Sequence, residues 1–317
     1  MSIVIEGYNE SHDQGAIDDT LAALSRQAYP LSRVHLVLVG SDRQAAEWQK
    51  AFATPEPFGS IRAVAAPDAH YYALKNIGAA LAGDGIIAFT DSDVKPDPEW
   101  LPAIAETLRD ADVAVGVSRF QGTDARTPGA RLRQVASAIT YAWILGRTGD
   151  PAPQGFLAHN VAFRTEIFRA HRYGVDHGRT CGSMLMFRDL KASGLRIALQ
   201  PRQQAAHYFT WGWWLGKFHY RAGYEVFRVR RLDAAYPHRW IRRLHLLEPL
   251  VTMFWHCAHD LRQWFPYSRI IGVPAALRVL LLPVLVPLSL AARGAEMIGM
   301  YATIASPETM RRWAESS

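Results

Sequence analysis

Two aspartates one residue apart, Asp91 and Asp93, follow an apolar run at 85–89. Successive side chains of an extended segment point to opposite sides, so these two carboxylates point the same way with Ser92 between them. Two carboxylates in one site repel each other unless a cation or a donor-rich ligand offsets their charge. Divalent cations such as Mg²⁺ and Mn²⁺ bind oxygen ligands, and Mg²⁺ often combines carboxylates with substrate phosphates. The pair therefore predicts a site for Mn²⁺ or Mg²⁺ and a diphosphate.

An alternation of strands and helices is predicted to position this pair. Apolar runs predict strands at 2–5, 34–39, 61–65 and 85–90. Helices are predicted between and after them, at 17–27, 45–52, 73–82 and 98–109. Strands separated by helices of this length indicate βαβ units and a mostly parallel sheet. Such open sheets bind ligands beyond the carboxyl ends of their strands, where the two aspartates lie.

The composition is that of a globular protein with anionic partners. Hydrophobic residues make up 49% of the 317 residues and charged residues 20%, which excludes disorder as the main state. A net charge of +6 suggests nucleotide phosphates, acidic lipids or nucleic acid as partners. Cys181 and Cys257 are far apart and form no CxxC motif, which argues against a disulfide framework and fits a reducing cytosol. Met1 leads directly into the first strand, so no signal peptide and a cytoplasmic N-terminus are expected.

The composition changes after the predicted sheet. Residues 207–243 are rich in aromatic and basic side chains, and 279–292 contain no charge. A basic aromatic segment beside an apolar one is typical of a membrane interface, although a packed helical subdomain with tryptophan in its core would look similar. The charge-free stretch is shorter than the ~20 residues of a full span, and Pro283 and Pro287 would kink it. An interfacial or re-entrant helix therefore suits it at least as well as a spanning one.

Several motifs, in order, resemble those of a family-2 glycosyltransferase of the GT-A fold, over about residues 2–225. They are IVIEGYNE at 3–10, QAYP at 27–30, KNIG at 75–78, FTDSD at 89–93, PEWL at 98–101, Gly155 with NVAFR at 160–164, ASGLRI at 192–197 and His207. The resemblance implies an α/β, Rossmann-like, mostly parallel sheet flanked by helices, here with a C-terminal apolar helical region associated with a membrane. We expect a transferase domain at 1–225, a basic aromatic connector at 226–245 and apolar helices at 246–317.

The resemblance also implies an activity, namely metal-dependent transfer of a sugar from a nucleoside-diphosphate sugar to a lipid or glycan acceptor. The transfer reaction would take place at the cytoplasmic face of the cell membrane, as in polysaccharide biosynthesis. Tyr8 and Glu10 would line the base and ribose pocket. Asp91 would bind the ribose or nucleotide side and would also be a catalytic residue. Asp93 would ligate the metal that bridges the diphosphate, and His207 would complete the metal shell.

Several of these residues also have a purely structural interpretation. Lys75 would face the phosphates or be an exposed helix lysine, and Ser92 would join the nucleotide-sugar site. Tyr8 could be strand-end packing, Glu10 a carboxylate at a helix N-terminus, and His207 a packed or surface histidine.

The chain departs from the family pattern at two places. Val39 stands where an acidic residue usually holds the nucleobase, and the nearby Asp42 is the candidate substitute. Gly182 and Ser183 stand where an acidic pair usually supplies the general base that direct displacement requires. The local candidates for a base are Asp176, His177 and Asp189, and Asp189 is preferred.

Other function classes are weighed against this one. The missing acidic pair supports a catalytically silent relative that binds a nucleotide sugar or a partner enzyme, whereas the intact Asp91-Ser92-Asp93 and His207 oppose it. A nucleotidyltransferase is disfavoured because no glycine-rich phosphate loop lies near the first strand, and a nicotinamide-dependent oxidoreductase because Gly-x-Gly-x-x-Gly is absent there. No nucleic-acid partner is expected, since no recognisable module accompanies the basic run 228–231.

Overall fold

The computed structural model describes residues 1–8, 15–146, 152–176, 182–233 and 239–316. The chain divides into two compact units, each built from two segments. Residues 1–118 and 149–207 form the first, and residues 119–148 and 208–317 form the second. The boundaries of these units differ from the expected domain boundaries at 225 and 245. The reason is that residues 119–148 and 208–225 pack with the C-terminal helices.

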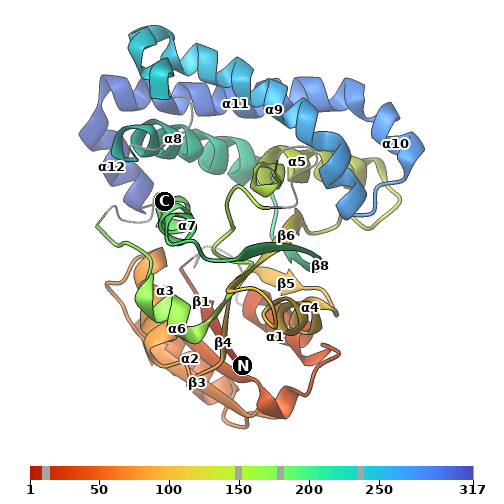
Figure 1. Ribbon diagram of the computed structural model, residues 1–317, viewed down its shortest axis with the longest axis vertical. Coiled ribbons are helices and arrows are strands. Elements are labelled where there is room, and N and C mark those ends of the chain that lie inside the picture. The colour runs from red at the N-terminus through yellow and green to blue at the C-terminus, as the bar shows by residue number, and fades with distance from the viewer. Residues whose placement is uncertain (9–14, 147–151, 177–181, 234–238, 317) are drawn as a thin grey trace. The chain divides into compact units, whose positions relative to one another are not determined.

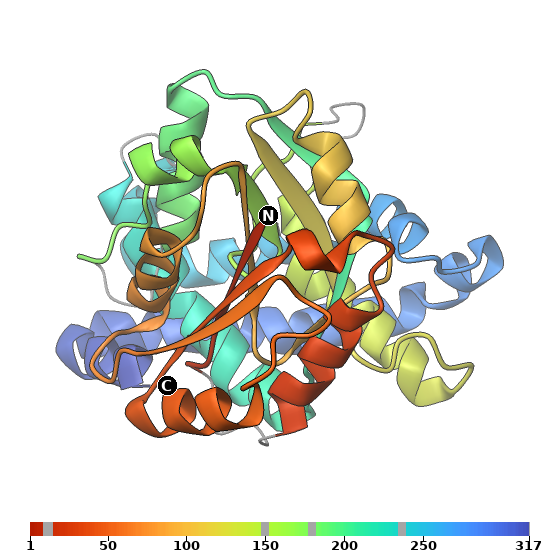
Figure 2. The ribbon, with the colours of Figure 1, turned by 90° about the horizontal axis from the view of Figure 1, so that it is seen from below.

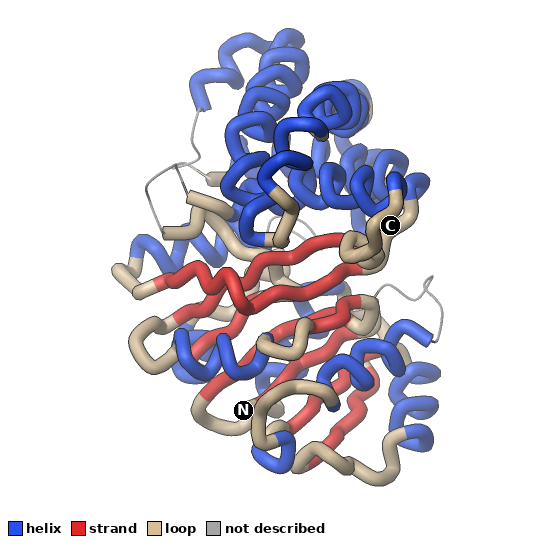
Figure 3. The backbone as a smooth tube through the Cα atoms, turned by 90° about the vertical axis from the view of Figure 1, so that its right-hand side faces the viewer, coloured by secondary structure: helices blue, strands red, loops and turns tan. Residues whose placement is uncertain are grey.

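The strands form one mixed sheet of eight (Figure 3). Its spatial order is β3 (Ser60–Ala65), β2 (His35–Gly40), β1 (Ser2–Glu6), β4 (Ile86–Asp91), β7 (Val161–Arg164), β6 (Val113–Phe120), β8 (Ile197–His207) and β5 (Val94–Pro96). The pairs β3–β2, β2–β1 and β1–β4 are parallel, whereas β4–β7, β7–β6 and β8–β5 are antiparallel. The four parallel strands are the four that the apolar runs predicted.

The predicted helices are also confirmed. Helices α1 (Gly15–Ser25), α2 (Asp42–Ala51) and α3 (Tyr71–Ala80) link the parallel strands, and α4 (Trp100–Thr107) follows β5 (Figures 1 and 2). Ile3 and Ile5 of β1 face a core shared with α1 and α4. On the other side of β1, a side chain at Gly78 would collide with Val4, so α3 needs glycine there to approach the strand. Three further helices follow the later strands of the chain: α5 (Pro128–Tyr141), α6 (Thr165–Ala170) and α7 (Gly182–Ala192).

Apart from the end of β6, the second unit is helical in its described residues. Besides α5, it contains the 3₁₀ turn η2 (Ala142–Ile144), the π-helix η3 (Trp213–His219), α8 (Tyr220–Leu232), the 3₁₀ segment η4 (Arg239–Leu247), α9 (Glu248–Ile270), α10 (Ala275–Leu280), α11 (Leu282–Ala305) and α12 (Pro307–Ser316). Helices α8 and α11 lie side by side (Figure 1) and cross at two glycines. A Cβ at Gly223 would collide with the Glu296 carbonyl, and one at Gly299 with the Tyr220 carbonyl.

One described helix, α11, is long and apolar enough to cross a membrane by length and composition alone. Pro283 lies in its first turn, where proline is tolerated, and Pro287 lies inside a helix that continues to Ala305. Length and composition do not distinguish a membrane span from a helix that packs inside a protein, so this property is weak evidence for either.

Candidate active site

The ends of β1 and β4 bring two carboxyl groups together. Strand β1 is paired with β2 on one side and with β4 on the other, so the order of the parallel strands reverses between β1 and β4. Open α/β sheets bind ligands beyond the strand ends at such a point. In this register Glu6 lies opposite Asp91, and both are buried. The Ser92 backbone N–H donates to the Glu6 carbonyl, which continues the pairing one residue further.

A lysine from α3 lies against these two groups. Its ammonium nitrogen is 2.5 Å from Asp91 Oδ1 and 4.0 Å from Glu6 Oε1. The Tyr71 hydroxyl, also from α3, donates to Asp91 Oδ2 at 3.0 Å. Lys75 is completely buried, so the alternative of an exposed helix lysine is wrong. Its partner is the Asp91 carboxylate, and it acts on the site by fixing the charge and position of that group.

The two carboxyl groups have opposite pKa shifts. Burial alone would raise the pKa of Asp91, but the neighbouring Lys75 ammonium lowers it to about 2. Burial raises the pKa of Glu6 well above its usual value, and the Asp91 charge raises it further. Glu6 therefore holds its proton far more tightly than Asp91, which is the ionised member of the pair.

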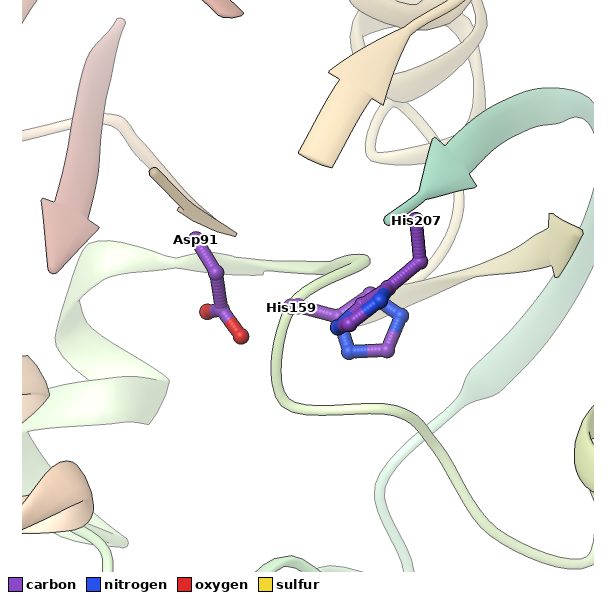
Figure 4. Close-up of side chains that lie close together, drawn as sticks. All are labelled: Asp91, His159 and His207. Atoms are coloured by element: carbon purple, nitrogen blue, oxygen red, sulfur yellow. The ribbon is translucent and has the colours of Figure 1, made fainter. Parts of the chain in front are cut away.

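The antiparallel pairing of β5 with β8 brings the late histidine to the same place. Val94 lies opposite His207, so the His207 ring is close to the aspartate pair, with Nε2 3.8 Å from Asp93 Oδ1. Both side chains are buried. The His207 ring centroid lies 5.0 Å from that of His159. His159 lies in the turn just before β7. Figure 4 shows the two rings against each other, with the Asp91 carboxylate turned toward them.

Asp91, His159 and His207 could together hold a metal ion. One ligand atom from each lies within 4.8 Å of the others, and all three residues are buried. Burial lowers the pKa of His159 to about 3, with His207 adding to the effect, so its imidazole is neutral and keeps a lone pair for a cation. A carboxylate and two imidazole side chains fit a divalent transition-metal ion, whereas Mg²⁺ prefers oxygen ligands. Asp93 lies beside His207, at the edge of this group.

The sequence analysis missed His159 and Glu6. His159 precedes Asn160 of the NVAFR motif, whose side chain accepts a hydrogen bond from the Trp100 indole at 2.8 Å. Asn160 Nδ2 also donates to Ser118 Oγ, and a His159 ring nitrogen lies 3.0 Å from the same oxygen. The position beside that motif was the only signal in the sequence. Glu6 had no signal of its own, because its role depends on the strand opposite.

The remaining predicted site residues are placed as follows. Tyr8 is half-buried, with its ring 6.4 Å from that of Tyr71 and its backbone N–H donating to Glu6 Oε2 at 2.7 Å. The Ser92 carbonyl accepts from the Thr20 hydroxyl at 2.8 Å, which fixes the turn between the two aspartates. Asp42 is exposed in the first turn of α2. Glu10 and the candidate base His177 lie outside the described residues.

The place of the missing acidic pair is filled by small residues that pack on an aromatic ring. A Cβ at Gly182 would lie 2.6 Å from the Tyr72 ring, so an acidic side chain has no room there. The Tyr72 hydroxyl donates to Ser183 Oγ at 3.2 Å. Asp189, two turns later on α7, has a 61% exposed side chain whose Oδ2 lies 2.5 Å from His171 Nδ1. Asp176 is also exposed.

Comparisons with known proteins identify the family from the sequence and the fold from the structure. The sequence pattern of the family Glycosyl transferase family 2 matches residues 2–190. The mannosyltransferase PcManGT from Pyrobaculum calidifontis, solved with GDP-Man and Mn²⁺, superposes with a TM-score of 0.63 at 16% identity, over 97% of this chain and 87% of that one. S. aureus TarS 1–349 with UDP-GlcNAc superposes with a TM-score of 0.52 at 14% identity, over 97% and 91%. Comparison with curated protein sequences gives no match.

Proposed function

The chain belongs to glycosyl transferase family 2, and from that premise we propose that it is a metal-dependent enzyme with a nucleoside-diphosphate sugar as donor and a lipid or glycan as acceptor. The observation that carries the metal dependence is the group of Asp91 at the end of β4, His207 at the end of β8 and His159 in the turn before β7. Its two imidazoles favour Mn²⁺ over Mg²⁺. GDP-mannose and UDP-GlcNAc, the sugars bound by the two superposed structures, are the first donors to test.

A bound divalent cation would supply positive charge against the diphosphate that leaves with the nucleoside. The chain's own residues prepare for this. Lys75 and Tyr71 hold the Asp91 carboxylate ionised and in one orientation, so that it need not be deprotonated or turned when the donor binds. The bond to the acceptor oxygen forms at the sugar carbon as the bond to the phosphate oxygen breaks, and the acceptor proton passes to a base. Asp189 remains our candidate for that base.

A second candidate function follows from the crowded position at Gly182. Because no acidic side chain fits there, a catalytically silent relative that binds a nucleotide sugar or a partner enzyme is the alternative. Both functions predict donor binding, but only the enzyme breaks the bond between sugar and diphosphate.

The test is a titration of the purified chain with GDP-mannose and UDP-GlcNAc, each with Mn²⁺, with Mg²⁺ and with a chelator. We expect thermal stabilisation by one donor in the presence of Mn²⁺, followed by slow release of the nucleoside diphosphate. Stabilisation without release would support the silent relative. Equal stabilisation with the chelator would contradict the proposed metal dependence.

A further inference from the structure

The helical unit exposes large apolar side chains on two of its helices. On α9 the exposed residues Leu250, Phe254, Leu261 and Phe265 recur at helical spacing, and Phe254 is 57% exposed. On α11 the exposed residues Val286, Leu290 and Ile298 also recur at helical spacing, and Ile298 is 56% exposed. Soluble monomers rarely expose contiguous apolar patches of this kind unless something binds there.

These two sets of side chains lie on the same side of the helix pair. The helices are antiparallel, because the Tyr301 hydroxyl near the end of α11 donates to Leu246 just before α9, and the Trp264 indole near the end of α9 donates to Arg278 just before α11. At their middle, Arg293 bonds Asp260. Viewed along each helix from its N-terminus, the exposed set lies about a quarter of a turn from Asp260 on α9 and from Arg293 on α11, in the same rotational sense. Asp260 and Arg293 face each other and the helices are antiparallel, so this rotation brings both sets to the same side of the pair. We call the surface made by Phe254, Leu261, Phe265, Val286, Leu290 and Ile298 the apolar face.

The exposed charged residues of the segment that carries the apolar face are basic. Residues 240–305 contain three acidic residues, Glu248, Asp260 and Glu296, and each is at most 3% exposed. Glu248 binds Arg230 and Arg231, whereas Asp260 and Glu296 bind Arg293. The exposed charges of this segment are therefore basic. They include Arg243 ahead of α9, and Arg262 and Arg269 on α9 itself. An apolar surface on a segment whose exposed charges are basic complements an anionic lipid surface.

The other sides of α11 argue for contact along a membrane surface instead of a crossing. Arg293 and Glu296 lie in the middle of α11, on its protein-facing side, and Arg293 also donates to the Ile139 carbonyl of α5. The glycine crossing with α8 occupies a further side, and α8 carries Arg228, Arg230 and Arg231. A crossing would carry these packed, charged neighbours into hydrocarbon, where charge is costly. The apolar face, by contrast, is exposed and carries no charged side chain.

We propose that the apolar face docks on an anionic phospholipid bilayer, with α9 and α11 lying in the plane of its surface. Phe254, Phe265 and Ile298 enter the boundary between headgroups and acyl chains, and Arg243, Arg262 and Arg269 meet the lipid phosphates. This interaction is independent of the proposed donor and metal site.

The test is flotation of the full-length protein with vesicles of phosphatidylcholine alone and of phosphatidylcholine mixed with phosphatidylglycerol. We expect binding to the mixed vesicles that weakens with salt and falls at least about tenfold in the Phe254→Glu/Phe265→Glu double variant. Both side chains are exposed, so thermal unfolding should not change. Val175→Glu, which alters an exposed apolar residue of the other unit, is the matched control and should bind like the parent.

Three outcomes would overturn the proposal. One is no flotation with either vesicle, and another is equal binding by the parent and the double variant. The third is a stable dimer in solution that the double variant dissociates, which would assign the apolar face to a second copy of the chain. None of these outcomes depends on whether the protein transfers a sugar, because no donor or metal is present in the assay.

Discussion

Lys75 Nζ lies 2.5 Å from Asp91 Oδ1 in a place where both side chains are buried. A buried carboxylate without a cation is costly, and a second carboxyl group, Glu6, lies 4.0 Å from the same ammonium. The lysine therefore makes it possible for the end of β4 to carry an ionised aspartate inside the protein. The same ion pair therefore affects both the stability of the sheet and the charge of the candidate site.

Lys75→Met should destabilise the protein by about 3–5 kcal/mol at neutral pH, because it leaves the Asp91 carboxylate buried without its partner. Urea unfolding followed by circular dichroism measures this. The control is Lys95→Met, which removes a partly exposed pair with Asp19 and should cost at most about 1 kcal/mol. Equal costs for the two variants would contradict the buried ion pair.

The same pair gives a pH signature. The folded pKa of Asp91 is lowered to about 2, so its ionisation contributes stability above its ordinary pKa, and that contribution is lost as the pH falls from about 4 to 2. In Lys75→Met the cause of the shift is gone, and the loss of stability over this range should shrink.

His159→Ala and His207→Ala should each weaken Mn²⁺ binding at least about tenfold, because each removes one imidazole from the group around Asp91. Calorimetric titration with Mn²⁺ alone measures this without any donor. Asp93→Ala, chosen from the sequence as the main ligand, should abolish metal-dependent donor binding while leaving the protein folded. For the titration with Mn²⁺ alone, Asp42→Ala, on the exposed first turn of α2, is the control. Unchanged Mn²⁺ affinity in both histidine variants would remove the imidazoles from the site.

The parallel half of the sheet could be predicted from the sequence because its signals are local. Each of its strands is a short apolar run, and each following helix has apolar residues at helical spacing, so β1 to β4 and α1 to α4 were found. The aspartate pair was found for the same reason, since its place after β4 can be read along the chain.

The contacts that complete the site depend on pairing between distant segments, which no local pattern shows. Strand β5 has only three residues, and it is the register of Val94 with His207 that brings the histidine to Asp93. The sequence left Lys75 as either a residue that faces the phosphates or an exposed helix lysine, because its burial depends on how α3 packs over β1 and β2. His159 lies outside the helices and strands, so the periodic patterns that predict those elements give no information about it.

His219→Phe should make stability less sensitive to acid. His219 is buried, and burial, with Arg293 adding to it, lowers its pKa to about 3, so the folded protein keeps it neutral while the unfolded chain binds a proton below about 6.5. Its contribution to stability therefore falls as the pH drops from about 6.5 toward 3, by up to about 1.4 kcal/mol per pH unit.

Phenylalanine preserves the ring that packs against Trp214, and it removes two ring nitrogens for which the described residues supply no hydrogen bond. Urea midpoints measured between pH 7 and pH 4 should therefore decline less steeply in the variant than in the parent. His35→Gln, at an exposed position, should follow the parent. Parallel declines in the parent and in His219→Phe would show that His219 is protonated in the folded protein.

Asp189→Asn should lower kcat about 100-fold or more with donor affinity unchanged, if Asp189 takes the acceptor proton, because the lost interaction belongs to the transition state. The competing view is that Asp189 only pairs with His171 on an exposed part of α7, and such a pair contributes little. Asp176→Asn, a second exposed carboxylate of the same region, is the control. Steady-state transfer rates decide between the views. Parental turnover in Asp189→Asn would exclude Asp189 as the base, and a loss in Asp176→Asn alone would transfer the role there.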